Sequence, residues 1–178
     1  MFDDWEFWKK VIHGDAEAFD TWYRESAPRL RSFLRHVLGN EHAAEDVMQE
    51  TFTHIWRQPQ GFDPERGTLR GYLFGAARRQ AAEWTRRNSL TGELVHDPPA
   101  PDHLDTASIV ADAFARLRSE QRTILWLREV EGQSYAELAA VLDVPVGTVR
   151  SRLFAAREAL RAVWHSTPNP AGGPHELR

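Results

Sequence analysis

The chain has 178 residues, 42% of them hydrophobic, and a formal net charge of −4. It contains no cysteine, which excludes disulfides and thiolate metal sites within the chain. No apolar run reaches the roughly 20 residues of a membrane span, and the amino terminus is acidic where a secretory signal would be basic. We therefore expect a cytoplasmic protein with one medium-sized domain or two small ones.

The charge is unevenly distributed along the chain. Acidic residues gather near the amino end, between Asp3 and Asp20, whereas arginines gather between Arg66 and Arg87. A negative total argues against a protein that coats nucleic acid without selectivity, but local basic patches suit DNA contact in defined places. We expect DNA to contact such patches and proteins to contact other surfaces.

Apolar residues recur at helical spacing throughout the chain and strand signals are almost absent, which predicts an all-α fold. The first helix is expected over residues 3–13. The second begins at its cap, Asp15, and Pro28 is expected to kink or restart it. The third is expected over residues 41–56.

The third helix carries a compact acidic and amide patch of Glu45, Asp46, Gln49 and Glu50. Such a face is usually only solvated surface, and the residues alone do not decide between that interpretation and an interface. Glu50 and His54 lie one turn apart, as a pair of metal ligands might. The paired Glu-x-x-His motifs of di-metal bundles are missing, however, so an ordinary surface pair is favoured over a metal site.

A loop with two prolines and two glycines, residues 57–67, follows. Thr68 is expected to cap the next helix, which runs to about Arg87. Arginines alternate with aromatic residues here. Surfaces that bind single-stranded DNA have this composition, because bases stack on the aromatic rings and arginines contact the phosphate backbone. Tyr72 is expected to lie in the core, whereas Phe62, in its loop, is expected to be functional.

The helical pattern is lost where the sequence HDPPAPDH has the composition of a linker. The predicted architecture is therefore two small helical domains joined by a flexible linker, and a Pro/Gly-rich tail that is expected to be disordered. The four segments are residues 1–87, 88–107, 108–165 and 166–178. In the second domain, Ser119 is expected to cap a helix.

The stretch from Ser134 to Arg161 has the pattern of a helix-turn-helix motif. Ser134 and Glu137 can form a capping box on its first helix. Pro145 ends that helix and opens the next one near Val146.

The second helix of this motif exposes arginines, hydroxyls and one aromatic ring, which suit contacts with phosphates and base edges in a major groove. A helical hairpin with a merely solvated basic face is the alternative. The coincidence of the capping box, the turn and the basic cluster favours DNA recognition. The candidate residues for this contact are Thr148, Arg150, Ser151, Arg152, Phe154 and Arg157.

Signatures of catalysis are missing from the sequence. There is no phosphate-cradling glycine loop, no Gly-x-Ser-x-Gly elbow and no evident nucleophile with its base, and the eight histidines are scattered. We predict no catalytic residue, no metal and no cofactor, and we expect that the protein is not an enzyme.

Four motifs in order form a larger pattern: AEDVMQETF, FDPERG, TLRGYLFGAARRQAAEWTRR and LREVEGQSYAELAAVLDVPVGTVRSRLFAAREALR. From about Gly14 to Arg161 the chain resembles the bacterial extracytoplasmic-function (ECF) sigma factors, which have only sigma regions 2 and 4. The resemblance implies an RNA polymerase sigma factor that binds core polymerase and directs promoter-specific initiation of transcription. It also implies contacts with the polymerase flap and with an anti-sigma factor.

The resemblance assigns roles to particular residues. Asp46, Gln49 and Glu50 match the motif that docks on the coiled coil of the polymerase largest subunit. The helix from Val146 matches the reader of the minus-35 promoter element. The loop and the helix after it match the part that opens the minus-10 element and captures a flipped base. That part contains Phe62, Arg66, Arg70, Arg78, Arg79, Trp84, Arg86 and Arg87.

Three positions depart from the family pattern. Arg79 stands where asparagine is frequent, and Tyr72 where tryptophan is common, which leaves the base preference at the minus-10 element open. Asp143 replaces a common glycine in the turn, and aspartate tolerates the left-handed conformation better than most residues. The rival interpretation is a helix-turn-helix regulator with a sensing or dimerisation domain at its amino end, which would leave the acidic and basic-aromatic helices unexplained.

Overall fold

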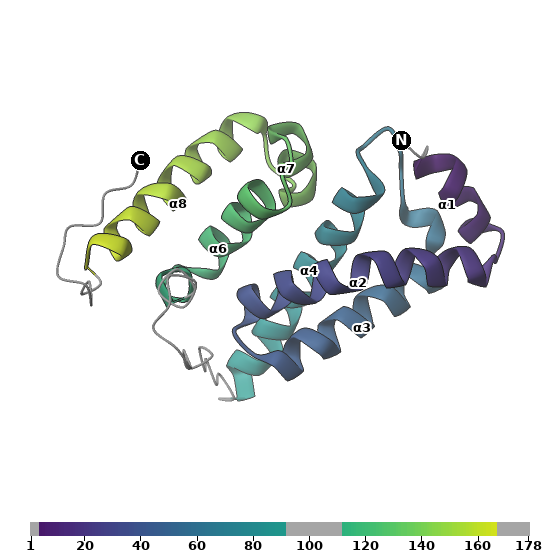
Figure 1. The fold of residues 1–178 in the computed structure, drawn as a ribbon, viewed down its shortest axis with the longest axis horizontal. Helices are drawn as coiled ribbons and strands as arrows, with labels where there is room; N and C mark the ends of the chain where they lie inside the picture. The colour runs from purple at the N-terminus through teal and green to yellow at the C-terminus, as the bar shows by residue number, and fades with distance from the viewer. Residues whose placement is uncertain (1–3, 92–111, 167–178) are drawn as a thin grey trace.

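The computed structural model describes residues 4–91 and 112–166, and within these ranges the chain is helical and contains no strand. This confirms the predicted all-α fold of two helical parts (Figure 1). The amino-terminal half contains α1 (Asp4–Ile12), α2 (Ala16–Leu38), α3 (Glu41–Arg57), the short 3-10 helix η1 (Pro59–Gly61) and α4 (Leu69–Thr91). The carboxy-terminal half contains α6 (Ser119–Leu125), the π-helical turn η2 (Trp126–Val130), α7 (Tyr135–Leu142) and α8 (Val146–Ser166).

Side-chain caps and one glycine fix the ends of α2 and the start of α3. Asp15 accepts a hydrogen bond from the main-chain N–H of Ala18 at 3.0 Å, which confirms it as the cap of α2. Gly39 ends α2 with φ of 68°, in the left-handed region that glycine enters at little cost. Asn40 then caps α3, so the two helices form a tight antiparallel hairpin.

Two predicted helix limits were wrong, and of the two alternatives predicted at Pro28, a kink or a restart, the restart does not occur. Helix α2 continues through Pro28 without a restart, because the core holds it on both sides of the proline, at Trp22 and at Leu30. Helix α4 runs to Thr91 instead of stopping at about residue 87. The cap position of α6 is Arg118, not Ser119, and Ser119 is the first helical residue.

The core of the amino-terminal half lies between α2, α3 and α4. Phe33 of α2 and Phe74 of α4 are buried and meet edge to face, with ring centroids 5.2 Å apart. In the carboxy-terminal half, Leu138 of α7 and Leu153 of α8 are among the fully buried side chains. The rest of the predicted linker beyond Thr91 and the predicted tail lie outside the described residues, apart from Ser166 at the end of α8.

Helix α1 holds both ends of the loop that joins α3 to α4. The indole N–H of Trp8, a fully buried residue, donates to the carbonyl oxygen of Pro59 at 2.7 Å. At the other end, the Asp4 carboxylate accepts from the main-chain N–H of Leu69, the first residue of α4, at 2.8 Å. The Thr68 hydroxyl accepts from the main-chain N–H of Gly71 at 3.1 Å, which confirms Thr68 as the cap of α4. Hydrogen bonds from α1 therefore hold both ends of this loop, although α1 precedes the loop by more than 40 residues. We call this pair of contacts the clamp.

The two halves pack against each other through α2 with α6 and α4 with α7. Arg122 of α6 is only 5% exposed. Its guanidinium donates to the carbonyl of Val37 on α2 at 2.9 Å and to the carbonyls of Ala115 and Leu117 in its own half. Burial disfavours the charged guanidinium and lowers the pKa of Arg122. Its three carbonyl partners offset part of the cost of burying this charge. Because the hydrogen bond to Val37 requires a defined position of α6 on α2, it restricts how the two halves can pack.

Candidate nucleic-acid and protein interfaces

The helix-turn-helix motif forms as its sequence predicts. The Ser134 hydroxyl accepts from the main-chain N–H of Glu137 at 3.2 Å, and the Glu137 carboxylate accepts from the N–H of Ser134 at 2.7 Å, which confirms the capping box. Asp143 occupies the turn with φ of 54°, the left-handed conformation expected of it. Helix α8 then begins at Val146.

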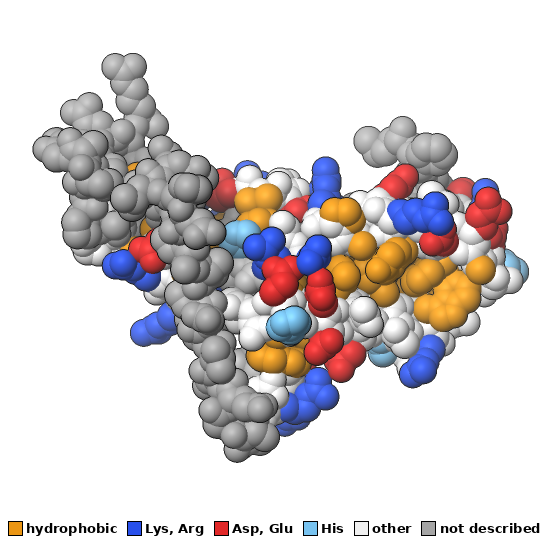
Figure 2. Space-filling view, turned by 60° about the horizontal axis from the view of Figure 1, so that its bottom comes forward, with side chains coloured by type: hydrophobic (Ala, Val, Ile, Leu, Met, Phe, Trp, Pro, Cys, Tyr) orange, Lys and Arg blue, Asp and Glu red, His pale blue; other side chains and the backbone are white. Residues whose placement is uncertain are grey.

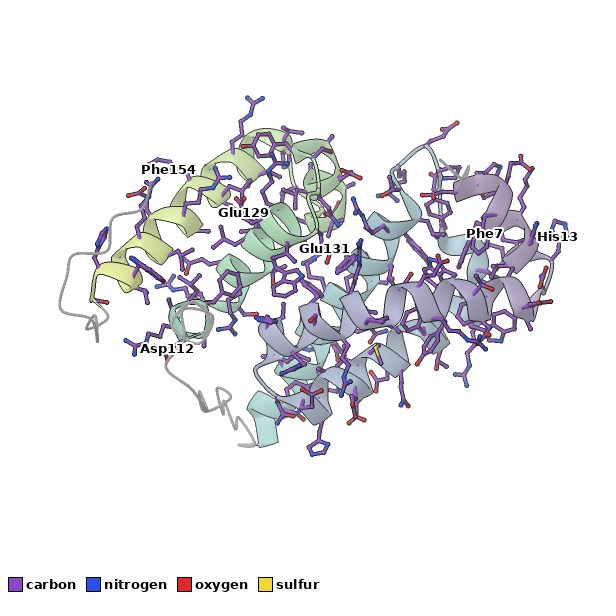
Figure 3. The ribbon with its side chains drawn as sticks, viewed as in Figure 1. Phe7, His13, Asp112, Glu129, Glu131 and Phe154 are labelled. Carbon is purple, nitrogen blue, oxygen red and sulfur yellow. The ribbon has the colours of Figure 1, made fainter. Side chains whose placement is uncertain are left out.

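Helix α8 presents a continuous exposed surface. Arg150, Ser151, Arg152 and Phe154 are exposed, and Phe154 is 68% exposed, which is unusual for a phenylalanine. It stands on the outer side of α8 in Figure 3. Thr148, the remaining predicted residue in the first turns, is half-buried. Helix α8 therefore exposes a phenylalanine ring and two arginines in its first turns.

Arg157, further along α8, is already paired. Its Nη2 lies 2.7 Å from Oε1 of Glu129 in η2, and this hydrogen bond raises the pKa of Arg157. Both side chains are largely exposed, so the pair contributes little stability. The carboxylate nevertheless offsets the charge that Arg157 would present to a phosphate.

The predicted acidic patch of α3 is exposed as expected. Asp46, Gln49 and Glu50 are all exposed and line an open groove of about 750 Å³ together with Trp84 and Arg87 of α4. The Glu50 carboxylate lies 3.5 Å from the Arg87 guanidinium. Trp84 and Arg87, predicted as minus-10 residues, therefore lie beside the predicted polymerase surface.

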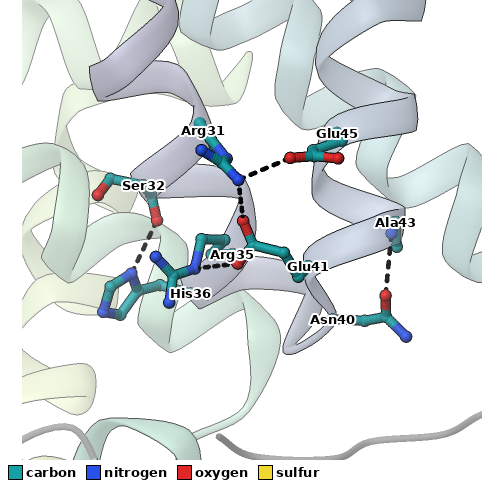
Figure 4. Close-up of polar contacts among 8 residues, drawn as sticks. All are labelled: Arg31, Ser32, Arg35, His36, Asn40, Glu41, Ala43 and Glu45. Atoms are coloured by element: carbon teal, nitrogen blue, oxygen red, sulfur yellow. Dashed lines mark hydrogen bonds and ion pairs between the residues drawn. The ribbon is translucent and has the colours of Figure 1, made fainter.

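A second set of acids on α3 has partners in α2. Arg31 Nη2 lies 2.6 Å from carboxylate oxygens of both Glu41 and Glu45, and Arg35 lies 2.6 Å from Glu41 (Figure 4). This network joins α2 to α3, and it includes Glu45, which we predicted as part of the acidic patch. Figure 2 shows the face that includes α3, where acidic, basic and hydrophobic side chains are mixed, as suits a protein partner better than a DNA backbone.

The loop after α3, the start of α4 and part of α7 enclose a pocket of about 150 Å³. Arg66 of the loop and Arg79 of α4 both line it, so the structure brings these two predicted minus-10 residues together. Tyr72 also lines the pocket, and partial burial raises the pKa of its phenol, against the effect of Arg79. A Cβ at Gly61 would lie 2.5 Å from the Tyr72 hydroxyl oxygen, so a larger residue there would displace the tip of the Tyr72 side chain.

Phe62 is not the free loop residue that we expected. It is 4% exposed and packs on Trp5, Trp8 and Tyr72, with centroid distances of 6.4, 6.2 and 5.7 Å. Its ring is therefore not accessible for stacking on a base in this conformation. Phe62 is nevertheless one of the residues that line the pocket.

The remaining predicted minus-10 residues are separated. Arg78 is partly buried and donates from Nε to the carbonyl of Val141 in α7 at 3.2 Å. Burial and the neighbouring charge of Arg79 lower the pKa of Arg78. Arg70 is half-buried, and Arg86 is exposed and paired with Glu83 farther along α4.

Neither a metal-binding group of side chains nor a membrane-spanning helix is found among the residues that the structure describes. No group of three His, Asp or Glu side chains there is placed to hold a metal ion. None of the helices described is both long and apolar enough to cross a membrane.

Comparisons with known proteins follow the same division of the chain. The Sigma-70 region 2 family model matches residues 14–91, and the Sigma-70 region 4 model matches residues 108–160. An ECF RNA polymerase sigma-E factor of Haemophilus influenzae is 31% identical over 172 residues, covering 85% of this chain and 90% of that protein. The ECF RNA polymerase sigma factor SigL of Mycobacterium tuberculosis is 32% identical over 149 residues, covering 78% and 84%.

Solved structures agree with the fold. CnrH in complex with the cytosolic domain of CnrY has a TM-score of 0.71 and 25% identity, covering 93% of this chain and 99% of that one. The sigma factor RpoE of Bartonella quintana, solved with the anti-sigma factor NepR, has a TM-score of 0.70 and 22% identity, covering 86% and 100%. With both family models matched in order and a relative of 31% identity covered over 90% of its length, the chain belongs to the ECF RNA polymerase sigma factors.

Proposed function

We propose that this sigma factor works in the cytoplasm through three separate surfaces. The patch of Asp46, Gln49 and Glu50 on α3 binds core RNA polymerase. The pocket lined by Arg66 and Arg79 receives the minus-10 element. The exposed face of α8 reads the minus-35 element as duplex DNA.

The exposed face of α8 is the observation that carries this proposal. A capped helix-turn-helix motif presents Arg150, Arg152 and Phe154 to solvent, where a major groove can receive them. Region 2 would comprise residues 1–87 and region 4 residues 108–165. Two weak DNA contacts tethered in one chain act together through effective concentration, so neither needs to be strong alone.

The proposal assigns this chain no catalytic chemistry, because bond formation belongs to the polymerase. An anti-sigma factor is a further proposed partner, supported by the fact that the relatives CnrH and RpoE were solved with CnrY and with the anti-sigma factor NepR. Such a partner would mask one or more of the three surfaces.

Transcription in vitro with purified core polymerase tests the proposal. Sustained initiation from a mapped promoter should require this chain. Asp46→Arg should reduce initiation and core binding together, because it reverses charge in the proposed polymerase surface. Asp20→Arg is the matched control, an exposed acid on α2, and should leave both unchanged.

The minus-35 contact is tested in the same assay. Arg152→Ala should lower discrimination between the correct and an altered minus-35 sequence by about 1 to 3 kcal/mol if the arginine reads a base. Arg161→Ala, exposed near the end of α8 and paired with Glu158, is the matched control. Tight promoter binding with no initiation would instead favour a helix-turn-helix regulator whose amino-terminal domain senses a ligand or dimerises.

A further inference from the structure

A second cavity, of about 310 Å³, lies where the two halves of the protein meet. It shares no lining residue with the pocket of Arg66 and Arg79. Residues of α2, α4, α6, α7 and α8 line it, so neither half forms it alone, and Figure 1 shows α6 between α8 and the amino-terminal helices. The volume lies at the lower end of the range for pockets that enclose small molecules.

Three arginines from separate parts of the chain give this cavity a positive charge. Arg78 lies on α4, Arg118 at the cap position of α6 and Arg152 on α8. Glu120 is the one acid among the described lining residues, which leaves a formal charge of +2. Within residues 4–91 and 112–166, none of the three guanidinium groups forms an ion pair. The cavity therefore carries positive charge that the protein itself does not neutralise.

Arg78 is oriented by one hydrogen bond that leaves its outer nitrogens available. Its Nε donates to the carbonyl of Val141 at 3.2 Å, and its Nη atoms have no partner among the described residues. Burial and then the charge of Arg79 lower the pKa of Arg78, and Arg152 adds to this effect. Asp143 opposes it only in part. An anion in the cavity would relieve the repulsion between these like charges.

The other walls of the cavity are mostly small or apolar. Ala81 and Ala82 of α4 and Ala155 of α8 leave room between the helices. Ile124 of α6 and Leu142 of α7 add apolar surface. A ligand that fits this lining has a charged end and an apolar body.

We propose that this cavity binds a small phosphorylated organic molecule of about the size of a nucleotide. Arginine suits a phosphate or diphosphate group, because its guanidinium donates paired hydrogen bonds to phosphate oxygens. More than one negative charge is required to neutralise the cavity, and the apolar walls accept the body of the molecule. A site bounded by five helices suits a small molecule better than a DNA duplex. The inference goes beyond the proposed function, since binding requires neither polymerase nor promoter.

Calorimetric titration of the full chain tests the site with three probes, adenosine diphosphate, pyrophosphate and adenosine, in magnesium-free buffer. Adenosine diphosphate should bind one to one, and at least about tenfold more tightly than either of the others, because it alone has both the charged and the apolar part. If adenosine diphosphate does not bind, or binds no more tightly than pyrophosphate, the proposal is wrong.

Arg118→Gln removes charge from the cavity at a residue that lies outside the proposed polymerase and DNA surfaces. It should weaken the binding of adenosine diphosphate by about tenfold or more, the range of a charged hydrogen bond. Arg116→Gln is the matched control, because Arg116 is exposed, does not line the cavity and is paired with Asp112. Equal losses in both variants would mean that the probe is attracted by general charge, which would contradict a built site.

Filling the cavity tests the site without changing its charge. Ala155 is exposed on α8, so Ala155→Phe should fold normally, occupy the cavity and weaken the binding of adenosine diphosphate at least about tenfold. Ala162→Phe, at an exposed position of α8 outside the cavity, should bind as the unmodified protein does. Undiminished binding by a folded Ala155→Phe variant would place the probe elsewhere and overturn the proposal.

Arg152 connects the cavity with the exposed face of α8, and this consequence rests on the proposed minus-35 role. Adenosine diphosphate at ten times its dissociation constant should weaken binding of a minus-35 duplex by up to about tenfold, as competition for one arginine predicts. At the same concentration, Arg118→Gln should show a smaller effect. An unchanged duplex affinity would contradict the place of Arg152 in the site. If the unmodified chain binds no minus-35 duplex at all, the proposed minus-35 role is wrong, while the calorimetric result still decides the cavity.

Discussion

Gln133 is the residue at which the structure predicts a gain in stability from a single substitution. Its side chain is 0% exposed, and within the residues described neither atom of its amide group has a hydrogen-bond partner. Its main-chain N–H and carbonyl are satisfied separately, by Leu127 at 3.0 Å and by Arg128 at 2.7 Å. The amide group is therefore buried at a cost that no contact offsets.

Gln133→Met replaces the amide with an unbranched apolar chain of similar length and leaves both main-chain bonds in place. A buried polar group without a partner costs about 1 to 3 kcal/mol, so the substitution should raise the free energy of unfolding by about that amount. For a chain of this size, that gain corresponds to a rise of about 2 to 12 °C in melting temperature.

Urea and thermal unfolding, followed by circular dichroism, measure the change. The slope of the urea transition should stay the same, because the surface exposed on unfolding hardly changes. Gln60→Met is the matched control on an exposed glutamine and should stay within about 0.5 kcal/mol. A fall in stability for Gln133→Met would refute the reasoning, since it would mean that the amide has a partner in solution, such as a buried water.

Three further predictions concern caps, pH and the face of α8. Ser134→Ala should cost about 0.5 to 2 kcal/mol in unfolding experiments, because it removes the cap of α7. Burial, and then the charges of two neighbouring arginines, lower the pKa of His36 below its usual 6.5, although a hydrogen bond to the Ser32 carbonyl opposes them. The folded state should therefore lose stability as pH falls from 6.5 through that lowered pKa, because the unfolded chain binds the proton more readily, and His36→Phe should remove this loss in melting curves. Glu129→Gln should strengthen binding to a minus-35 duplex about 1.5- to 5-fold by freeing Arg157 from its exposed partner, and an unchanged or weaker affinity would show that Arg157 does not face the DNA.

Signals that lie close together in the sequence predicted much of this structure. The capping box of Ser134 and Glu137 was predicted correctly because it depends on a few neighbouring residues. The left-handed Asp143 was expected from the resemblance to the family, in which glycine is common at this turn. At Pro28 the sequence left a kink and a restart open, because the local cost of the proline does not report the core contacts that keep α2 continuous.

The sequence predicted which residues are candidates for the sites, but not which of them lie together or are buried in the fold. The burial of Phe62 depends on Trp5 and Trp8, more than 50 residues earlier, and no local pattern reports such a contact. The position of α7 over α4 joins residues 63 apart, Arg78 and Val141.

The clamp that α1 places on the loop has a consequence for how promoter preference can change. The region 2 family model begins at residue 14, so Asp4 and Trp8 lie outside the segment that it matches. They nevertheless fix both ends of the loop, at Leu69 and Pro59, and thereby the shape of the pocket lined by Arg66. If that pocket receives the minus-10 element, as we propose, substitutions in α1 can alter which base it accepts without changing any residue that touches DNA.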